Sequence, residues 1–385
     1  MNRTGTTAFC LLLLTAAAAS GAAPRARDLG VPFDGVPGPL NAITDVAGVT
    51  VGHVTLIESS DPAHQVRTGV TAILPRGRDS GSLPSFGASF ALNGNGEMTG
   101  TAWLEESGML EGPVLLTNTH SVGVVRDAAI AWRVRSGQAD ASGYWWSLPV
   151  VAETWDGYLN DINGFHVRPE HVFAALDGAR AGPVEEGNVG GGTGMICHEF
   201  KCGIGTSSRR VAVGAQTYTV GILVQANYGV RDTLRIAGVP VGEQLREHRI
   251  YSDPALGGDT GSIIIVVATD APLLPHQLKR LARRAALGLA RNGSYAGNGS
   301  GDLFVAFSTA NVDAVRGRTL NSAEFVGNDA IDPLFRGTVE ATEEAIVNAL
   351  IAARDLKGQN GRYAIAIPHA ALRELLRRYN RLVSR

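Results

Sequence analysis

The residues best placed to do chemistry in this 385-residue chain stand at one junction, where Gly261 precedes Ser262. A polar, glycine-rich segment ends at Gly261, and the β-branched run SIIIVVAT begins at once. A serine hydroxyl next to a strained Gly–Ser bond can attack the preceding carbonyl, and hydrolysis of the resulting ester frees an α-amine on Ser262. Glycine suits the first position because it tolerates strained backbone conformations. The same pattern also fits a loop that simply enters a buried strand.

Other catalytic patterns are absent from the sequence. It contains no G-x-S-x-G, H-E-x-x-H or G-x-G-x-x-G motif and no phosphate loop that ends in G-K-S/T. Its nine histidines are scattered and form neither a triad nor a metal-binding pattern. A serine that carries its own α-amine needs no histidine, because an α-amine has a pKa of about 8 and can accept a proton near neutral pH. We therefore expect no cofactor and no metal.

The elements that position this junction alternate between strands and helices. Strands are predicted for VTVGHVTLI, GVTAILP, SFALN, PVLLTNT, RVAVGAQTYTVGILVQAN, SIIIVVAT, DLFVAFST and YAIAIP. The run SIIIVVAT predicts a strand that is buried on both faces. Helices are predicted over residues 123–135, 169–176, 272–290, 340–352 and 370–382. This interleaving favours two sheets covered by helices.

Several stretches resemble the P1 family of β-peptidyl aminopeptidases and L-aminopeptidase/D-esterases, the DmpA-like peptidases. They include PVLLTNTHSVG, PVVAETWDGYLNDINGFHV, EGNVGGGTGMICHEFKCGIGTSSR, GILVQANYG, GSIIIVVATDAPLLPHQLKRLARRAALGLARNGS and SGDLFVAFSTAN. The similarity runs from about Asp34 to the C-terminus. It implies a four-layer αββα sandwich of the N-terminal-nucleophile type. It also implies autocleavage before Ser262 into an α chain (residues 24–261) and a β chain (residues 262–385).

The resemblance assigns the reacting groups one by one. Ser262 matches the processed nucleophile, and its free α-amine matches the base. Ser300 and Asp302 match a second serine and a carboxylate that hold this amine. If their strand begins early enough, they alternate as i and i+2 and share one face; the competing reading is the polar face of an edge strand. Asn227 matches an asparagine that donates to the developing oxyanion.

Substrate recognition is implied for three further residues. Glu153 matches a carboxylate that holds the free ammonium of the substrate. Trp155 stands where a member of the family has tyrosine, so a hydroxyl role there is lost or passes to Tyr158. The implied substrates are short peptides, amides or esters whose N-terminal residue is a β-amino acid or a small L- or D-amino acid. The resemblance also implies that the α and β chains stay associated and form a homo-oligomer of αβ units, with a tetramer as the expected assembly.

Composition and the first residues limit the partners and the compartment. The net charge of −2 gives no electrostatic footprint for nucleic acid. Arg3 and the apolar run from Ala8 to Ala19 predict a signal peptide over residues 1–23, because that run is too short to span a bilayer. We expect an exported protein, periplasmic or secreted, that is not membrane-bound.

Two cysteines, Cys197 and Cys202, remain beyond the signal segment. Their spacing is compatible with a disulfide and with two free thiols. A zinc site that includes His198 is a third reading, although no second ligand pair follows at a suitable spacing.

Two other functions remain open from the sequence. One is an acyltransferase of the ornithine acetyltransferase type, which also cleaves itself but uses threonine. The other is an inactive binding protein on the same fold.

Overall fold

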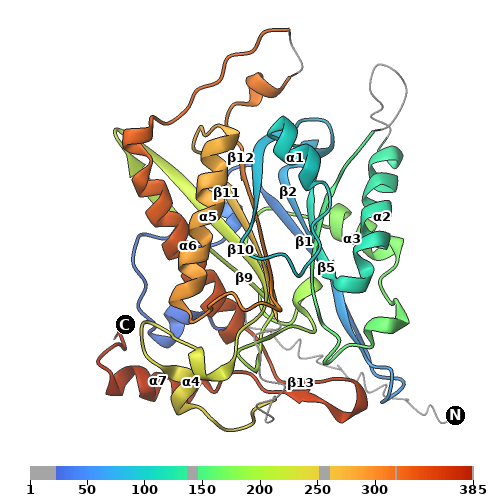
Figure 1. The fold of residues 1–385 in the computed structure, drawn as a ribbon, viewed down its shortest axis with the longest axis vertical. Coiled ribbons are helices and arrows are strands. Elements are labelled where there is room, and N and C mark those ends of the chain that lie inside the picture. Colours follow the sequence, from blue (N-terminus) through green and yellow to red (C-terminus); the bar gives the residue numbers. More distant parts are fainter. Residues whose placement is uncertain (1–22, 137–145, 251–260, 317–318, 384–385) are drawn as a thin grey trace, which may run out of the picture.

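In a computed structural model of the chain, two β-sheets face each other and helices cover the outer face of each sheet (Figure 1). The structure describes residues 23–136, 146–250, 261–316 and 319–383. The predicted signal peptide therefore lies almost entirely outside the described residues. No helix in the described part of the chain is long and apolar enough to cross a membrane.

The larger sheet has six strands in the order β4-β3-β12-β11-β10-β9. These strands are β3 (Ser85–Ala91), β4 (Met109–Leu110), β9 (Ile204–Val213), β10 (Gln216–Asn227), β11 (Ser262–Thr269) and β12 (Gly301–Ser308). β11 runs antiparallel to β10 and parallel to β12. Every residue of β11 is buried, which confirms the strand predicted from SIIIVVAT. A central strand with helices on one side and a second sheet on the other needs apolar side chains on both faces.

The smaller sheet has four strands in the order β1-β2-β5-β6. They are β1 (Thr50–Glu58), β2 (Val66–Arg78), β5 (Val114–Asn118) and β6 (Val150–Thr154), and β6 lies at the edge, parallel to β5. Two short hairpins complete the strands: β7 (Ile196–Cys197) with β8 (Phe200–Lys201), and β13 (Leu356–Lys357) with β14 (Tyr363–Ala364).

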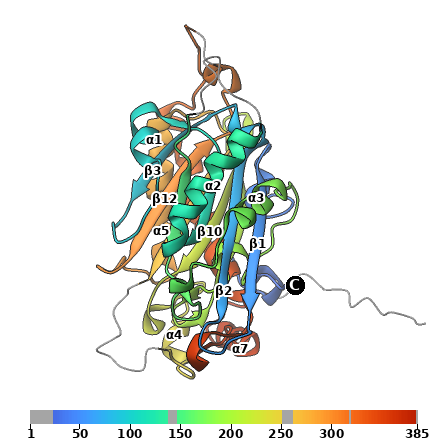
Figure 2. The ribbon, with the colours of Figure 1, turned by 90° about the vertical axis from the view of Figure 1, so that its right-hand side faces the viewer.

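Helices lie outside both sheets (Figure 2). They are α1 (Thr101–Ser107), α2 (Val122–Arg135), α3 (Pro169–Asp177), α4 (Val241–Gln244), α5 (Pro275–Arg291), α6 (Asp332–Ile351) and α7 (His369–Arg378). α5 and α6 share a core with the six-stranded sheet, and α2 and α3 share one with the four-stranded sheet. A third apolar layer fills the space between the sheets and includes Ile264 and Val266 of β11 and Ala152 of β6. The predicted αββα sandwich is confirmed.

One predicted helix begins at the wrong residue. The sequence pattern places it over 340–352, but α6 starts at Asp332 and has a proline in its first turn. α6 packs on β9, β10 and α5 and is buried along most of its length. The part of α6 before Glu340 includes Pro333, Gly337 and Thr338, whose low helix propensity weakens the helix signal there.

Candidate active site

Three neighbouring strands bring Asn227, Ser262 and Gly301 to one edge of the six-stranded sheet. β10 ends at Asn227, while β11 and β12 begin at Ser262 and Gly301. In the register, Ser262 is paired with Asn227 on one side and with Gly301 on the other. The backbone N–H of Gly301 donates a hydrogen bond to the Ser262 Oγ, at 3.1 Å. The candidate nucleophile is therefore held between two strands, and its side chain is almost fully buried.

Ser300 and Asp302 meet beside this edge. The Ser300 hydroxyl donates to Asp302 Oδ1 at 2.7 Å, and both side chains are buried. β12 begins one residue after Ser300, so Ser300 precedes the regular strand, but the two side chains lie together as expected. The reading of Asp302 as the polar face of an edge strand is wrong, because β12 lies between β11 and β3.

Asp302 has a second partner, Asn93, that the sequence does not indicate. Asn93 Oδ1 accepts a hydrogen bond from the Asp302 backbone N–H at 2.5 Å, and Asn93 Nδ2 donates to Asp302 Oδ2 at 3.2 Å. Asn93 lies in the turn-forming stretch NGNGE that follows β3. The Asn and Gly residues of that stretch signal a turn, but nothing in them indicates contact with a strand so distant in sequence.

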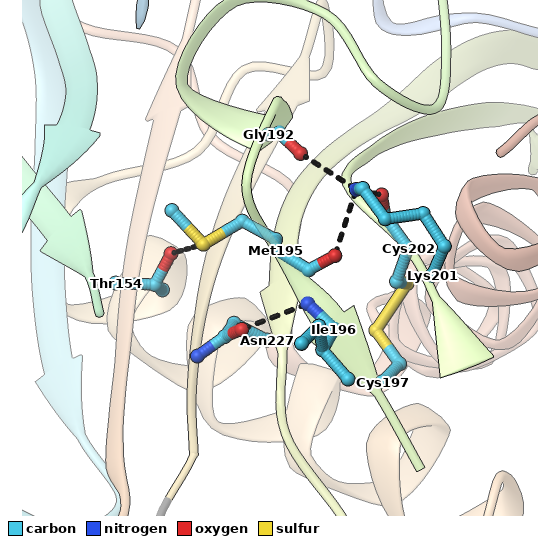
Figure 3. The surroundings of a disulfide bond; sticks show 8 residues. All are labelled: Thr154, Gly192, Met195, Ile196, Cys197, Lys201, Cys202 and Asn227. Carbon is cyan, nitrogen blue, oxygen red and sulfur yellow. Dashed lines mark hydrogen bonds between the residues drawn. A yellow bond between two sulfur atoms is a disulfide. The ribbon is translucent and has the colours of Figure 1, made fainter. Parts of the chain in front are cut away.

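Both ends of the Asn227 side-chain amide have a defined neighbour. Oδ1 accepts from the Ile196 backbone N–H at 2.8 Å (Figure 3), and Nδ2 donates to the Trp155 carbonyl oxygen at 2.9 Å. A primary amide carries two N–H donors, and among the described residues only the Trp155 carbonyl is recorded as their acceptor, so the second N–H can serve an oxygen of the substrate. This is the group that an oxyanion requires.

Glu153 is supplied by β6 of the opposite sheet. Its carboxylate is buried and accepts hydrogen bonds from the Glu97 backbone N–H, at 2.9 Å, and from the Thr119 hydroxyl. Burial raises the pKa of Glu153, while the hydrogen bonds from Thr119 and Glu97 act in the opposite direction. A buried carboxylate with few donors can be balanced by a cation, which agrees with the ammonium-binding role expected from the sequence.

Gly96 lies between Glu153 and the start of β12 at Gly301, the residue paired with Ser262. A Cβ built on Gly96 would lie 3.2 Å from Gly301 Cα and 3.3 Å from Glu153 Oε1. A single methyl group added at residue 96 would therefore touch both Gly301 and Glu153. The backbone at residue 96 thus brings the edges of the two sheets together, which no spacing in the sequence indicates.

Gly261 also lies in close contact with this edge. A Cβ on Gly261 would fall 2.1 Å from the Asn227 carbonyl oxygen and 2.5 Å from Tyr228 Cα. Any side chain there would collide with the backbone, so the approach of residue 261 to β10 requires glycine.

The two aromatic candidates lie in different surroundings. Trp155 directly follows β6 and is 44% exposed, and its ring lies against Gly157. Its carbonyl oxygen contacts Asn227. Tyr158 packs in a cluster with Leu159 and Ile196 and lies under the Arg362 guanidinium, 5.1 Å from the ring centre. Burial raises the pKa of the Tyr158 hydroxyl.

Cys197 and Cys202 form a disulfide. This result settles the alternatives left open by the sequence, since a disulfide leaves neither thiolate to bind zinc. Within the residues that the structure describes, no group of three or more His, Cys, Asp or Glu side chains could hold a metal ion.

The fold is that of the serine aminopeptidases of the N-terminal-nucleophile type. The profile of peptidase family S58 matches residues 41–364, and the chain belongs to that family. Membership of a peptidase family favours a hydrolase over an acyltransferase and over an inactive binding protein.

Individual relatives are similar along nearly their whole length. The β-peptidyl aminopeptidase BapA of Sphingosinicella microcystinivorans is 53% identical, over 97% of this chain and 96% of its own. Among solved structures, the L-aminopeptidase D-Ala-esterase/amidase of Ochrobactrum anthropi, described as a variant of the Ntn hydrolase fold, superposes with a TM-score of 0.88 at 50% identity, over 94% of this chain and 100% of that one. A β-aminopeptidase from a Burkholderia species gives 0.84 at 49% identity, with the same coverage.

Proposed function

We propose that this aminopeptidase cuts its own chain between Gly261 and Ser262 and then uses Ser262 to release N-terminal residues from short peptides, amides and esters. One observation carries the proposal. The register of β10, β11 and β12 pairs Ser262 with Asn227 on one side and, on the other, with Gly301, which stands between the hydrogen-bonded residues Ser300 and Asp302. The family resemblance gives each of these residues its role.

Self-processing begins with the Ser262 hydroxyl. Its oxygen attacks the Gly261 carbonyl carbon, the C–N bond breaks, and the acyl group is left as an ester on Oγ while the nitrogen becomes the α-amine. Water then hydrolyses the ester and leaves a carboxylate on Gly261. The absence of a side chain at residue 261 supports this step, because the backbone there lies against β10.

Turnover in the cleaved enzyme uses the new α-amine as the base. The amine takes the proton of the Ser262 hydroxyl as Oγ attacks the substrate carbonyl, and the second N–H of Asn227 stabilises the oxyanion. The proton then passes to the leaving amine or alcohol, and water releases the acyl group from Oγ. Ser300 bonds the α-amine, and Asp302 fixes the Ser300 hydroxyl through the contact at 2.7 Å.

Recognition of the free amino terminus falls to Glu153. A substrate ammonium beside this carboxylate would compensate the burial that raises its pKa. Trp155 forms a wall next to it, and blocked amines would leave the carboxylate without its cation. The names of the relatives support β-amino acids and small L- or D-amino acids as the residues released.

Export and assembly form part of the same proposal. The signal-like segment at residues 1–23 supports a periplasmic or secreted protein. The Cys197–Cys202 disulfide supports an oxidising compartment. The family resemblance supports α and β chains that stay together in a homo-oligomer, with a tetramer as the expected assembly.

A denaturing gel with N-terminal sequencing tests the processing step. The purified protein should give two bands, and the smaller one should begin at Ser262. Ser262→Ala should give one band without activity. Ser308→Ala is a matched control, because Ser308 ends β12 at the opposite edge of the same strand pair; it should be cleaved normally. A smaller band that begins at any other residue would contradict the proposal.

A further inference from the structure

The hairpin of β7 and β8 is closed by the Cys197–Cys202 disulfide. Two residues with left-handed backbone, His198 and Glu199, form its turn, with φ values of 47° and 62°. Both cysteines are fully buried. A left-handed conformation is unfavourable for residues other than glycine, so this turn needs support from its surroundings. The covalent bond across its base supplies part of it, and Arg231, which donates to the His198 and Glu199 carbonyl oxygens, supplies another part.

A buried lysine holds the base of the same hairpin. The Lys201 Nζ donates to the Met195 and Cys202 carbonyl oxygens at 2.8 and 2.5 Å (Figure 3). Burial lowers the pKa of Lys201 well below its usual value. The Cys202 backbone N–H donates to the Met195 carbonyl at 3.0 Å. The residue before β7 is thus tied to the residue after β8.

The hairpin determines which way the Asn227 amide points. A backbone N–H can only donate and a carbonyl oxygen can only accept. The Ile196 N–H therefore requires Oδ1 on its side, at 2.8 Å, and the Trp155 carbonyl requires Nδ2 on the other, at 2.9 Å. If Ile196 moved away, Oδ1 would lose its partner and the amide could rotate, which would turn an acceptor toward the oxyanion.

We propose that the Cys197–Cys202 disulfide positions the oxyanion donor, by holding the Ile196 N–H against Asn227. The cysteines are positioning residues, since neither touches the substrate. The inference rests on the proposed role of Asn227 and adds the covalent bond on which the orientation of that side chain depends. It predicts an effect on the transition state and little effect on substrate binding.

The first test is the double variant Cys197→Ser/Cys202→Ser. We expect kcat to fall about tenfold with KM within a factor of about two, because small displacements of a catalytic group lower the rate far more than they weaken ground-state binding. The affinity for an amino aldehyde, which forms a tetrahedral adduct on the nucleophile, should fall in parallel with kcat. Unchanged kcat, or an equal loss in the affinity for a free amino acid product, would overturn the inference.

A double-mutant cycle separates positioning from general destabilisation. In an Asn227→Ala background, removal of the disulfide should lower kcat no further, since the group that it positions is gone. Losses that simply multiply would show that the disulfide acts elsewhere. If Asn227→Ala alone left kcat unchanged, the proposed oxyanion role would fail, and that outcome is distinct from failure of the cycle.

Reduction of mature wild-type enzyme covers the case in which the variants are not cleaved. A dithiol such as dithiothreitol, in subdenaturing urea where needed, breaks the S–S bond, gives two thiols and closes to its own cyclic disulfide. The α chain should gain the mass of two hydrogen atoms, kcat should fall, and reoxidation should restore it. The cleaved double-serine variant, where available, is the control and should not respond. Full activity in fully reduced enzyme would refute the proposal.

Discussion

The two sheets meet at the candidate site but contribute to it in different ways. On the six-stranded sheet, Asn227, Ser262 and Gly301 are placed by continuous strand pairing. On the four-stranded sheet, Glu153 projects from an edge strand and is held by hydrogen bonds from Glu97 and Thr119, which lie outside the strands. In the proposed mechanism, bond breaking belongs to the six-stranded sheet and recognition of the amino terminus to the edge strand of the four-stranded sheet. Substitutions on the two sheets should therefore separate kcat from KM.

The largest effect on the cleaved enzyme is expected on the six-stranded sheet. Asn227→Ala should lower kcat by about 10²–10³ with a small change in KM, since loss of one oxyanion donor costs roughly 3 kcal/mol in the transition state. Steady-state kinetics on an aminoacyl p-nitroanilide measures both constants. Asn188→Ala, which removes an amide bonded to the Arg354 backbone, is the control. If KM rose in Asn227→Ala while kcat stayed unchanged, Asn227 would bind the substrate and not the oxyanion. The two sheets would then not differ in their roles.

A smaller effect, on KM and not mainly on kcat, is expected for a substitution on the four-stranded sheet. Glu153→Gln should raise KM and lower kcat/KM by about 10–100-fold, because loss of a charge-assisted hydrogen bond costs roughly 1.5–3 kcal/mol. Glu97→Gln is a matched control, since it keeps the backbone N–H that Glu97 donates to Glu153 and removes only an exposed charge that adds to the raised pKa of Glu153; its KM should change far less. N-acetylated substrates should be poor for every variant. Unchanged kinetics in Glu153→Gln would mean that another residue binds the ammonium.

The carboxylate behind the nucleophile should affect the pH profile more than the absolute rate. In the proposed mechanism Asp302 favours the charged form of the α-amine, so Asp302→Asn should move the rising limb of kcat to lower pH and reduce kcat by about tenfold. The limb should lie near or somewhat below pH 8 in the wild type, at about the pKa of an α-amine. Comparison of substrates whose own amines have different pKa values identifies the limb that belongs to the enzyme. If neither kcat nor the limb changes, Asp302 has no part in the proton path.

The smallest effect on activity is expected for a substitution of Asp156, which follows β6, the strand that carries Glu153. Its substitution should change the pH dependence of the free energy of unfolding instead. Burial raises the pKa of Asp156 to about 7 from 3.8. Between these values the folded protein keeps a proton that the unfolded chain releases, so the free energy of unfolding should fall as pH rises from about 4 to 7. Asp156→Asn should flatten this slope, by an amount on the order of 2–4 kcal/mol at most. Thermal melts at pH 4–7 compare the two proteins.

The buried His53 gives a slope of the opposite sign in both proteins. Burial lowers its pKa to about 4, so acid favours the unfolded state below its usual pKa of 6.5. The difference between the wild type and Asp156→Asn therefore reports on the carboxyl group together with the buried Lys201, whose pKa the Asp156 charge raises. An identical slope in the two proteins would contradict the assignment to Asp156.

The sequence predicts the strand that carries Ser262 far better than it predicts the residues that hold the two carboxylates of the site. The strand SIIIVVAT is predictable because burial on both faces leaves an uninterrupted β-branched run. The role of Ser262 is suggested by the abrupt change at Gly261 and by the family resemblance. The residues that hold Asp302 and Glu153 are not predictable in this way, because Asn93 and Thr119 reach them through loop geometry that leaves no periodic signal.

Contacts through backbone atoms were the hardest to foresee. The Ile196 N–H that orients Asn227 would be present whatever the side chain at that position. The approach of Gly96 to Glu153 depends on how two sheets pack, which is decided by residues throughout the interface. The early start of α6 is not predictable for a different reason, since Pro333, Gly337 and Thr338 in its first turns have low helix propensity.

The strand order of the six-stranded sheet determines how two polypeptides would behave after a cut at Gly261. β11 and β12, from the downstream piece, lie between β3 and β10, which both belong to the upstream piece. Neither piece could leave without breaking hydrogen-bonded ladders on both sides of that pair. Dissociation would therefore be equivalent to unfolding. A cleaved heterodimer of this kind would survive dilution while folded, but its melting temperature should rise with protein concentration, because unfolding releases two chains where an uncut protein releases one.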